Sequence, residues 1–348
     1  MDRILTYAEA IREATVQEMT RDPSVIVLGL GVDDFKALYG TTRELQDEFG
    51  PERVFDTPLS EDGMTGVAIG AALAGLRPIH VHIRMDFVLL AMNQIVNMAA
   101  KARYMYGGAV SVPIVIRSVI GRSWGQGAQH SQALHALFMH IPGLRVVAPG
   151  SPYDAKGCLI QSIRDDNPVM FIEHRMLHPQ RGHVPAELYT VPFGKARVLV
   201  RGSDITLVGV SYMAVECLRA QRYLDEVGIS AEVIDPISLS PLDTDTIVAS
   251  VRKTGRLVVV DTGWTMCGAS AEILAQVAER LQGVPHIRWQ RIGFAPVTCP
   301  TTKNLENLFY PNAQTIASAA FGMVHDNQKP WAPQHKEAPE IVEFKGPF

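Results

Sequence analysis

Glu61 is the acidic residue whose position best suits proton chemistry. It follows Ser60, a residue type that caps helices, and it opens an apolar helical pattern in the run PLSEDGMTG. An ordinary glutamate in a first helical turn is stabilised by about 0.3–1 kcal/mol through the helix dipole. A partly buried carboxyl at the same place can instead exchange a proton with a nitrogen of a ligand ring. The local sequence allows both interpretations.

His130 is the second candidate, in the glycine-rich run GQGAQHSQ ahead of an expected helix over 131–140. At a helix N-terminus the positive end of the dipole disfavours imidazolium and lowers the pKa of a histidine. A neutral imidazole above a parallel sheet can act as an acid–base or polarising group, and a capping histidine is the simpler interpretation. His135 and His140 follow on the same helix, and we expect them to pack or to face solvent.

The sequence contains no strong match to a metal-binding, nucleophilic or phosphate-binding motif. His80 and His82 alternate on one strand face, but no third ligand stands at zinc spacing. Ser131 is not part of a GxSxG elbow, and no GxGxxG or Walker A pattern is present. The cysteines form no CxxC pair, which is typical of free thiols in a reducing compartment. One expected helix carries a series of glycines that favours close helix packing over a phosphate cradle: Gly63, Gly66, Gly70 and Gly75.

Alternating strands and helices must position these residues. In the first half, strands separated by helices of ten or more residues imply a parallel sheet with helices on both faces. A capping box at Thr6 opens the first helix, which runs through Met19. The further expected strands cover 25–29, 79–83, 113–117, 145–148 and 169–173, and the further expected helices cover 61–74, 86–106, 131–140 and 152–164.

A second α/β pattern follows an irregular stretch. The run from His174 to Lys195 holds three prolines and two glycines and is the expected domain linker. Beyond it we expect strands over 205–210, 231–235, 257–261 and 287–292, and helices over 213–227, 244–253 and 269–281. The sequence thus predicts an α/β fold with two open sheets flanked by helices. Its expected domains cover 1–185 and 186–325, and an extended tail covers 326–348.

The composition is that of a globular protein of two domains. Its 348 residues carry a formal net charge of −4, which gives no electrostatic footprint for nucleic acid. The apolar runs are too short to span a membrane, and the N-terminus lacks a signal-peptide pattern, so we expect a cytoplasmic protein. The mean hydropathy of +0.07 is high for an isolated soluble monomer. A large core or a surface covered by a partner would explain it.

Several runs resemble the beta subunit of thiamine-diphosphate-dependent 2-oxoacid dehydrogenases. They are FDTPLSEDGMTGVAIGAALAGLRP, DFVLLAMNQIVNMAAKARYMYGG and the run from GAQHSQALHALF to NPVMFIEH. In the second half, VPFGKARVLVRGSDITLV and EVIDPISLSPLD resemble the transketolase C-terminal-type domain, so the resemblance spans about residues 4 to 322. It implies a transketolase-like pyrimidine-binding domain followed by that second domain. It also implies the decarboxylase component of a pyruvate, branched-chain 2-oxoacid or acetoin dehydrogenase complex, which passes an acyl group to a lipoyl domain.

The resemblance implies roles for single residues. Glu61 matches the glutamate that hydrogen-bonds the ring nitrogen of the cofactor's aminopyrimidine, a role suited to a carboxyl of raised pKa. Phe87 matches an aromatic residue that packs against this ring. His130 matches an active-site histidine that handles protons and meets the lipoyl group. Some members hold a structural potassium ion at positions that match Ile114, Ser162, Ile163, Asp165 and Asn167.

The family binds the cofactor diphosphate and magnesium through a GDG motif, and this chain has none. The resemblance therefore implies that a separate alpha subunit holds both groups, in an α2β2 heterotetramer that works with a lipoyl-bearing acyltransferase core. Two alternatives stay open: a split transketolase-like enzyme that moves a two-carbon unit to an aldehyde or sugar, and a non-catalytic assembly scaffold. Departures from the family pattern leave the oxo acid and the acceptor undecided: Val81, His82, Arg84, Arg122, Trp124 and His135.

Overall fold

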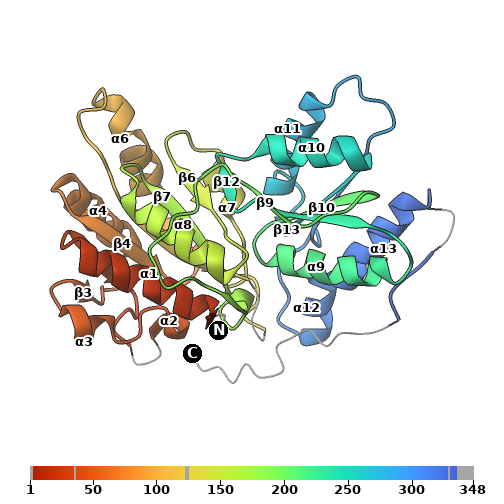
Figure 1. The fold of residues 1–348 in the computed structure, drawn as a ribbon. Coiled ribbons are helices and arrows are strands. Elements are labelled where there is room, and N and C mark those ends of the chain that lie inside the picture. Colours follow the sequence, from red (N-terminus) through yellow and green to blue (C-terminus); the bar gives the residue numbers. More distant parts are fainter. Residues whose placement is uncertain (1–2, 35–36, 122–124, 328–329, 335–348) are drawn as a thin grey trace. The chain divides into compact units, whose positions relative to one another are not determined.

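In the computed structural model the chain is described over residues 3–34, 37–121, 125–327 and 330–334. It divides into two compact units, each with an open sheet flanked by helices, as the sequence predicts (Figure 1). Unit 1 contains Met1–Ile120, Ala133–Phe193 and Leu239–Pro241. Unit 2 contains Gly121–Gln132, Gly194–Ser238 and Leu242–Phe348.

Unit 1 is built on a seven-stranded sheet of order β12-β6-β7-β5-β4-β2-β3. The five strand pairs from β6 to β3 are parallel. Strands β2, β5 and β7 are buried along their whole length, as a parallel sheet covered on both faces requires. The strands are β2 (Val25–Gly29), β3 (Val54–Phe55), β4 (Arg77–His82), β5 (Val115–Ile120), β6 (Arg145–Val147), β7 (Val169–His174) and β12 (Ser238–Ser240).

The helices of unit 1 that begin at Tyr7, Glu61 and Pro152 start where the sequence places them, two others differ as described below, and those at Ala37 and Leu45 were not expected. The first helix, α1, has the expected capping box, in which Thr6 and Glu9 bond each other's backbone N–H groups. It packs against α8 (Figure 1). The helices are α1 (Tyr7–Arg21), α2 (Ala37–Gly40), α3 (Leu45–Phe49), α4 (Glu61–Leu73), α5 (Met85–Val88), α6 (Ala100–Met105), α7 (His135–Met139) and α8 (Pro152–Arg164).

Two expected helices differ from the structure. The helix expected over 86–106 contains a 3₁₀ turn at Leu89–Ala91 and a π-helical segment at Asn93–Ala99 between α5 and α6. The helix expected over 131–140 is only α7, which begins at His135. The Leu134 N–H explains this late start, because it donates to the Met85 sulfur at 3.1 Å instead of an intrahelical carbonyl.

The stretch expected as an irregular linker, His174–Lys195, contains secondary structure. A 3₁₀ turn covers Arg175–Leu177, and β8 (Arg181–His183) pairs antiparallel with β1 (Ile4–Thr6). The sequence did not reveal this short strand, because three residues are too few to show a period and its partner is distant in sequence.

Unit 2 has a five-stranded sheet of order β14-β13-β10-β11-β9. The first four strands are parallel, and β9, which the sequence did not reveal, pairs antiparallel with β11. The strands are β9 (Arg197–Val200), β10 (Ile205–Gly209), β11 (Ala231–Asp235), β13 (Arg256–Trp264) and β14 (Arg288–Phe294). The helices are α9 (Tyr212–Asp225), α10 (Thr244–Thr254), α11 (Ala269–Arg280), α12 (Lys303–Phe309) and α13 (Ala313–Val324).

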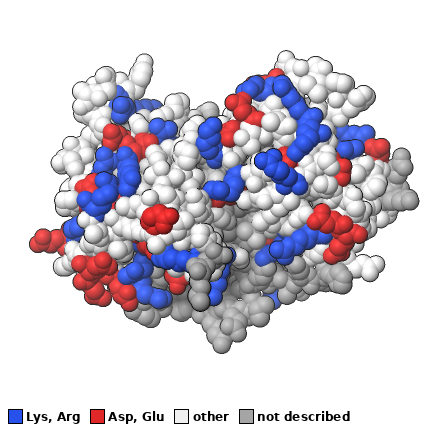
Figure 2. All heavy atoms as spheres, in the orientation of Figure 1, with Lys and Arg blue, Asp and Glu red and all other residues white. Residues whose placement is uncertain are grey.

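The surface carries charges of both signs. On the face drawn in Figure 2, Lys and Arg side chains are interspersed with Asp and Glu. Within the described ranges, no helix has the length and apolar character needed to cross a membrane.

Candidate functional site

Glu61 and Phe87 lie at the carboxyl edge of the seven-stranded sheet. Glu61 opens α4, which follows β3, and Phe87 belongs to α5, which follows β4. These two strands flank β2 in the sheet. Ligands of open parallel sheets bind in the crevice outside the carboxyl ends of the strands. Glu61 is half-buried and the Phe87 ring is 37% exposed, so both side chains remain accessible to a ligand at this edge.

The start of α4 differs from the expectation in one detail. Ser60 occupies the N-cap position, but its side chain does not bond the helix backbone. Its hydroxyl instead lies beside Gly63, where an added Cβ would come within 2.9 Å of the Ser60 Oγ. Further along the same helix, Gly70 has no atom of the described chain within 4 Å of an added Cβ. The glycine-rich face of α4 is therefore only partly covered by this chain.

A buried polar cluster joins α4 to β4. The Thr65 hydroxyl lies 3.1 Å from His80 Nε2 and 3.5 Å from His82 Nε2, and His80 Nδ1 lies 3.3 Å from the Leu28 carbonyl oxygen. Burial lowers the pKa of His80 to about 4, although the bond to Leu28 opposes it. Burial and then the charge of His80 place the pKa of His82 well below its usual value. Both imidazoles are therefore neutral at pH 7.

A buried ion pair joins the two central strands β5 and β7. Arg117 donates to both Glu173 oxygens, at 2.7 and 3.0 Å, and the Nε2 of His178 lies 3.2 Å from the same carboxylate. Burial alone would raise the pKa of Glu173, but Arg117 and His178 outweigh it and lower the pKa to about 2. The His178 ring stacks on Tyr39 at 5.0 Å, and the Arg175 guanidinium lies 4.6 Å from the Tyr39 ring centroid.

His130 belongs to unit 2 and is half-buried. Because α7 begins at His135, the expectation that His130 stands at a helix N-terminus is wrong. Two glycines with positive φ, Gly125 and Gly127, place its segment against Thr301. A Cβ added at Gly125 would lie 2.5 Å from the Thr301 carbonyl oxygen, and one added at Gly127 would lie 2.6 Å from the Thr301 methyl group. The close contact between this segment and Thr301 therefore requires glycine at both positions.

The residues expected to hold potassium lie near one another in unit 1. They are Ile114, Ser162, Ile163, Asp165 and Asn167. The Ile114 carbonyl accepts from the Val169 N–H, while the Arg77 guanidinium donates to the carbonyl oxygens of Ile163 and Asp165, at 2.9 and 3.3 Å. Carbonyl oxygens at a helix C-terminus suit a hard cation, and each has a second lone pair to offer. Two of these carbonyl oxygens already accept from the cationic Arg77 guanidinium.

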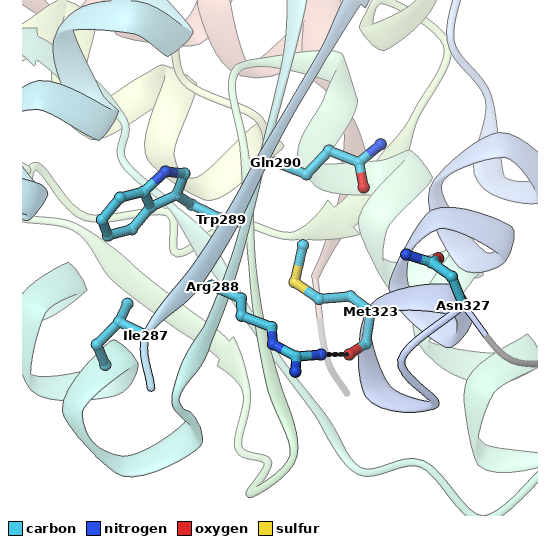
Figure 3. A pocket seen from close by; sticks show the side chains of 6 residues that line it. All are labelled: Ile287, Arg288, Trp289, Gln290, Met323 and Asn327. Carbon is cyan, nitrogen blue, oxygen red and sulfur yellow. Dashed lines mark hydrogen bonds between the residues drawn. The ribbon is translucent and has the colours of Figure 1, made fainter. Parts of the chain in front are cut away.

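A pocket of about 490 Å³ in unit 2 contains none of the predicted residues (Figure 3). It lies on the edge strand β14 beside the end of α13, where Arg288 donates to the Met323 carbonyl oxygen and pairs with Asp326. Its lining consists of Ile287, Arg288, Trp289, Gln290, Met323 and Asn327.

The remaining candidates are placed as follows. Arg84 and His135 are buried and His140 is exposed, whereas Arg122 and Trp124 lie outside the described residues. Sequence reasoning missed Thr65, because the residue pattern alone does not place α4 against the two histidines of β4. In the described ranges, no group of three or more His, Cys, Asp or Glu residues could hold a metal ion.

Comparison with known proteins identifies relatives over nearly the whole chain. Residues 4–180 match the family model "Transketolase, pyrimidine binding domain", and residues 194–316 match "Transketolase, C-terminal domain". The chain is 44% identical over 330 residues to the acetoin:2,6-dichlorophenolindophenol oxidoreductase subunit beta of Cupriavidus necator, covering 92% of this chain and 97% of that protein. It is 42% identical over 315 residues to the pyruvate dehydrogenase E1 component subunit beta of Rickettsia bellii, covering 90% and 97%.

A solved structure described as a split gene transketolase, inactive beta4 tetramer, has the same fold. The TM-score is 0.74 at 23% identity, and the match covers 92% of this chain and 99% of that chain.

The buried histidines predict an acid-sensitive fold. His80 binds a proton near pH 6.5 when unfolded but only near pH 4 when folded, so its stabilising effect is complete above pH 6.5 and falls as the pH drops towards 4. We expect a loss of about 3 kcal/mol in the free energy of unfolding from His80 alone by pH 4. Denaturant unfolding at pH 7 and pH 4.5 measures it. His80→Gln should flatten this drop and the exposed-residue control His140→Gln should not; equal drops in both would contradict the assignment.

Removing one partner of the Arg117–Glu173 ion pair should lower the free energy of unfolding strongly. In Glu173→Gln the Arg117 charge stays buried without its carboxylate, and we expect a loss of roughly 3–5 kcal/mol in unfolding free energy. The double variant Arg117→Met/Glu173→Leu, which removes both charges, should recover most of this loss. Urea unfolding of both variants measures the difference, and a double variant as unstable as the single one would contradict this account.

Proposed function

This chain belongs to the family of beta subunits of thiamine-diphosphate-dependent 2-oxoacid dehydrogenases, and on that premise we propose how it works. It is the beta chain of the component that oxidatively decarboxylates a 2-oxo acid and passes the acyl group to a lipoyl domain. The observation that carries this proposal is 42–44% identity, over 97% of each relative, to beta subunits that act in pyruvate and acetoin oxidation. The position of Glu61 and Phe87 at one sheet edge supports it.

Thiamine diphosphate supplies a carbon nucleophile and an electron sink when bound. The accessible carboxyl and ring at the sheet edge fit its aminopyrimidine end. The Glu61 carboxyl would hold a proton at the pyrimidine ring nitrogen, and the exposed Phe87 ring would pack against the face of the pyrimidine. His130 would give or take a proton on the substrate side, because an imidazole has one nitrogen that can donate a proton and one that can accept it.

An alpha subunit completes the enzyme in this proposal. With no GDG motif here, the alpha chain would hold the diphosphate and magnesium in an α2β2 heterotetramer, which would work with a lipoyl-bearing acyltransferase core. Exposed apolar side chains on α4 and on the helical run that includes α6 support a covered surface. They include Val67, Leu73, Leu90, Met98 and Tyr104. All four cysteines are free thiols, which supports the cytoplasmic location that we propose.

Acetoin is the second candidate substrate, because the relative at 44% identity is named for acetoin oxidation. Transfer of a two-carbon unit to a sugar is less well supported, since the transketolase structure at 23% identity shows the fold alone. The presence of Glu61, Phe87 and His130 argues against a non-catalytic scaffold.

Co-expression with an alpha subunit tests the function. The purified complex is supplied with thiamine diphosphate and magnesium, and with pyruvate, a branched-chain 2-oxo acid or acetoin as substrate. Separate reactions contain 2,6-dichlorophenolindophenol, a lipoyl domain or a phosphosugar as acceptor. We expect cofactor-dependent reduction of the dye and acylation of the lipoyl domain. Product formation only with a phosphosugar acceptor would overturn the proposal in favour of a transketolase-like enzyme.

Glu61→Gln tests the central residue in the same assay. Because an amide cannot exchange the proton, we expect a fall of roughly 10²–10⁴-fold in kcat. Asp62→Asn is the matched control, since it removes a charge from the same first helical turn, and its activity should stay within about twofold of wild type. Near-normal activity of Glu61→Gln would remove this residue from the mechanism.

Potassium binding is proposed at the carbonyl oxygens near Ile163 and Asp165. A cation that binds only the folded chain stabilises it by mass action, and we expect a melting temperature roughly 2–4 °C higher in potassium chloride than in tetramethylammonium chloride at the same concentration. Thermal unfolding in the two salts measures this. Equal melting temperatures at all concentrations would exclude a structural potassium site.

A further inference from the structure

The hydroxyl of Thr65 lies at the point where α4 meets β4. Its side chain is fully buried and contacts two imidazoles of one strand, at 3.1 and 3.5 Å. The histidines themselves are 2% and 3% exposed, and their ring centroids are 4.4 Å apart. The mechanism proposed above gives these three side chains no role. Burying three polar groups together is costly unless they bond one another.

The Leu28 carbonyl fixes the direction of the hydrogen bond between Thr65 and His80. The Leu28 carbonyl can only accept, so the neutral His80 ring carries its proton on Nδ1 and offers Nε2 as an acceptor. The Thr65 hydroxyl therefore donates to His80 Nε2. Its oxygen is then free to accept from His82 Nε2 over the longer distance. The depressed pKa values keep both rings neutral at pH 7, so each ring has one nitrogen that can accept and one that can donate.

The chain of bonds connects α4, which carries Glu61, to β4, the strand that precedes the helix of Phe87. Thr65 lies four residues after Glu61 on α4, so the two side chains share one face of the helix. His82 ends β4, and Phe87 follows five residues later in α5. The other buried residues of α4 are Ala68, Ile69 and Ala72, which offer only apolar contacts to the sheet. Apolar packing resists sliding and rotation of a helix less specifically than a directed hydrogen bond.

We propose that Thr65, through its contacts with His80 and His82, is a positioning residue that holds the Glu61 carboxyl in place relative to the Phe87 ring. This inference rests on the proposed binding of thiamine diphosphate by those two residues. Ser118, the register partner of His82 on β5, adds a fully buried hydroxyl to the same strand pair, and within the described residues that hydroxyl has no hydrogen-bond partner. Thr65 therefore supplies the hydroxyl that bonds both rings.

Thr65→Val in the complete complex with the alpha subunit tests the proposal. The substitution keeps the shape of the side chain and removes the hydroxyl, so Glu61 loses its fixed position. We expect kcat/KM for the 2-oxo acid to fall roughly ten- to a hundredfold and the apparent KM for thiamine diphosphate to rise. Thr65→Ser restores the hydroxyl and should recover both values, which a merely structural role would not require.

The matched control is Thr15→Val. Thr15 is also fully buried, but among the described residues its hydroxyl bonds only the Ile11 carbonyl of its own helix, so both kinetic values should stay near wild type. If Thr65→Val does not give a folded complex, Thr65→Ala provides the same test with a smaller side chain. Wild-type kinetics in a folded Thr65 variant without the hydroxyl would overturn the inference alone. A wild-type complex that neither binds nor requires thiamine diphosphate would overturn the proposed function, and the inference with it.

Discussion

The parallel pairing of β4 with β2 and β5 determines where polar chemistry can occur in unit 1. Leu28 is paired with His80, and His82 with Ser118, within strands that are buried almost throughout. Strands covered on both faces leave accessible polar groups only at their ends. The side chains that can reach a ligand therefore come from the segments after the carboxyl ends, including Glu61 after β3 and Phe87 after β4.

Polar residues within this sheet are tolerated because each is neutral or paired. Glu173 keeps its charge through Arg117 and His178, whereas His80 avoids a charge because burial lowers its pKa. The two solutions fail in different parts of the acid range. The carboxylate stabilises the fold above pH 4.5 and loses this effect towards pH 2, while the imidazole already begins to destabilise it below pH 6.5. The histidines therefore set the acid limit of unit 1 first.

The sequence predicted those elements whose signals are local. The capping box at Thr6 located α1, and helical periodicity with a following glycine located α4 to within one residue at its end. Features that depend on tertiary contacts were missed. The contact of Leu134 with Met85 delays α7, and the pairing of β8 with the N-terminal strand orders part of the expected linker. Helical periodicity also cannot reveal a π-helical segment, because it does not distinguish bonds to residue i+4 from bonds to i+5.

The candidate site shows the same division between local and non-local information. Glu61 and Phe87 could be named because residue type and order carry their resemblance, whereas Thr65 became visible only when α4 was placed on β4. The open side of α4 extends this argument beyond the chain. Gly70 has open space where a Cβ would stand, and Val67 and Leu73 are exposed apolar residues of the same helix. They are explained if α4 presents Glu61 at one end and is covered along its length by another subunit, which also accounts for the high mean hydropathy of the chain.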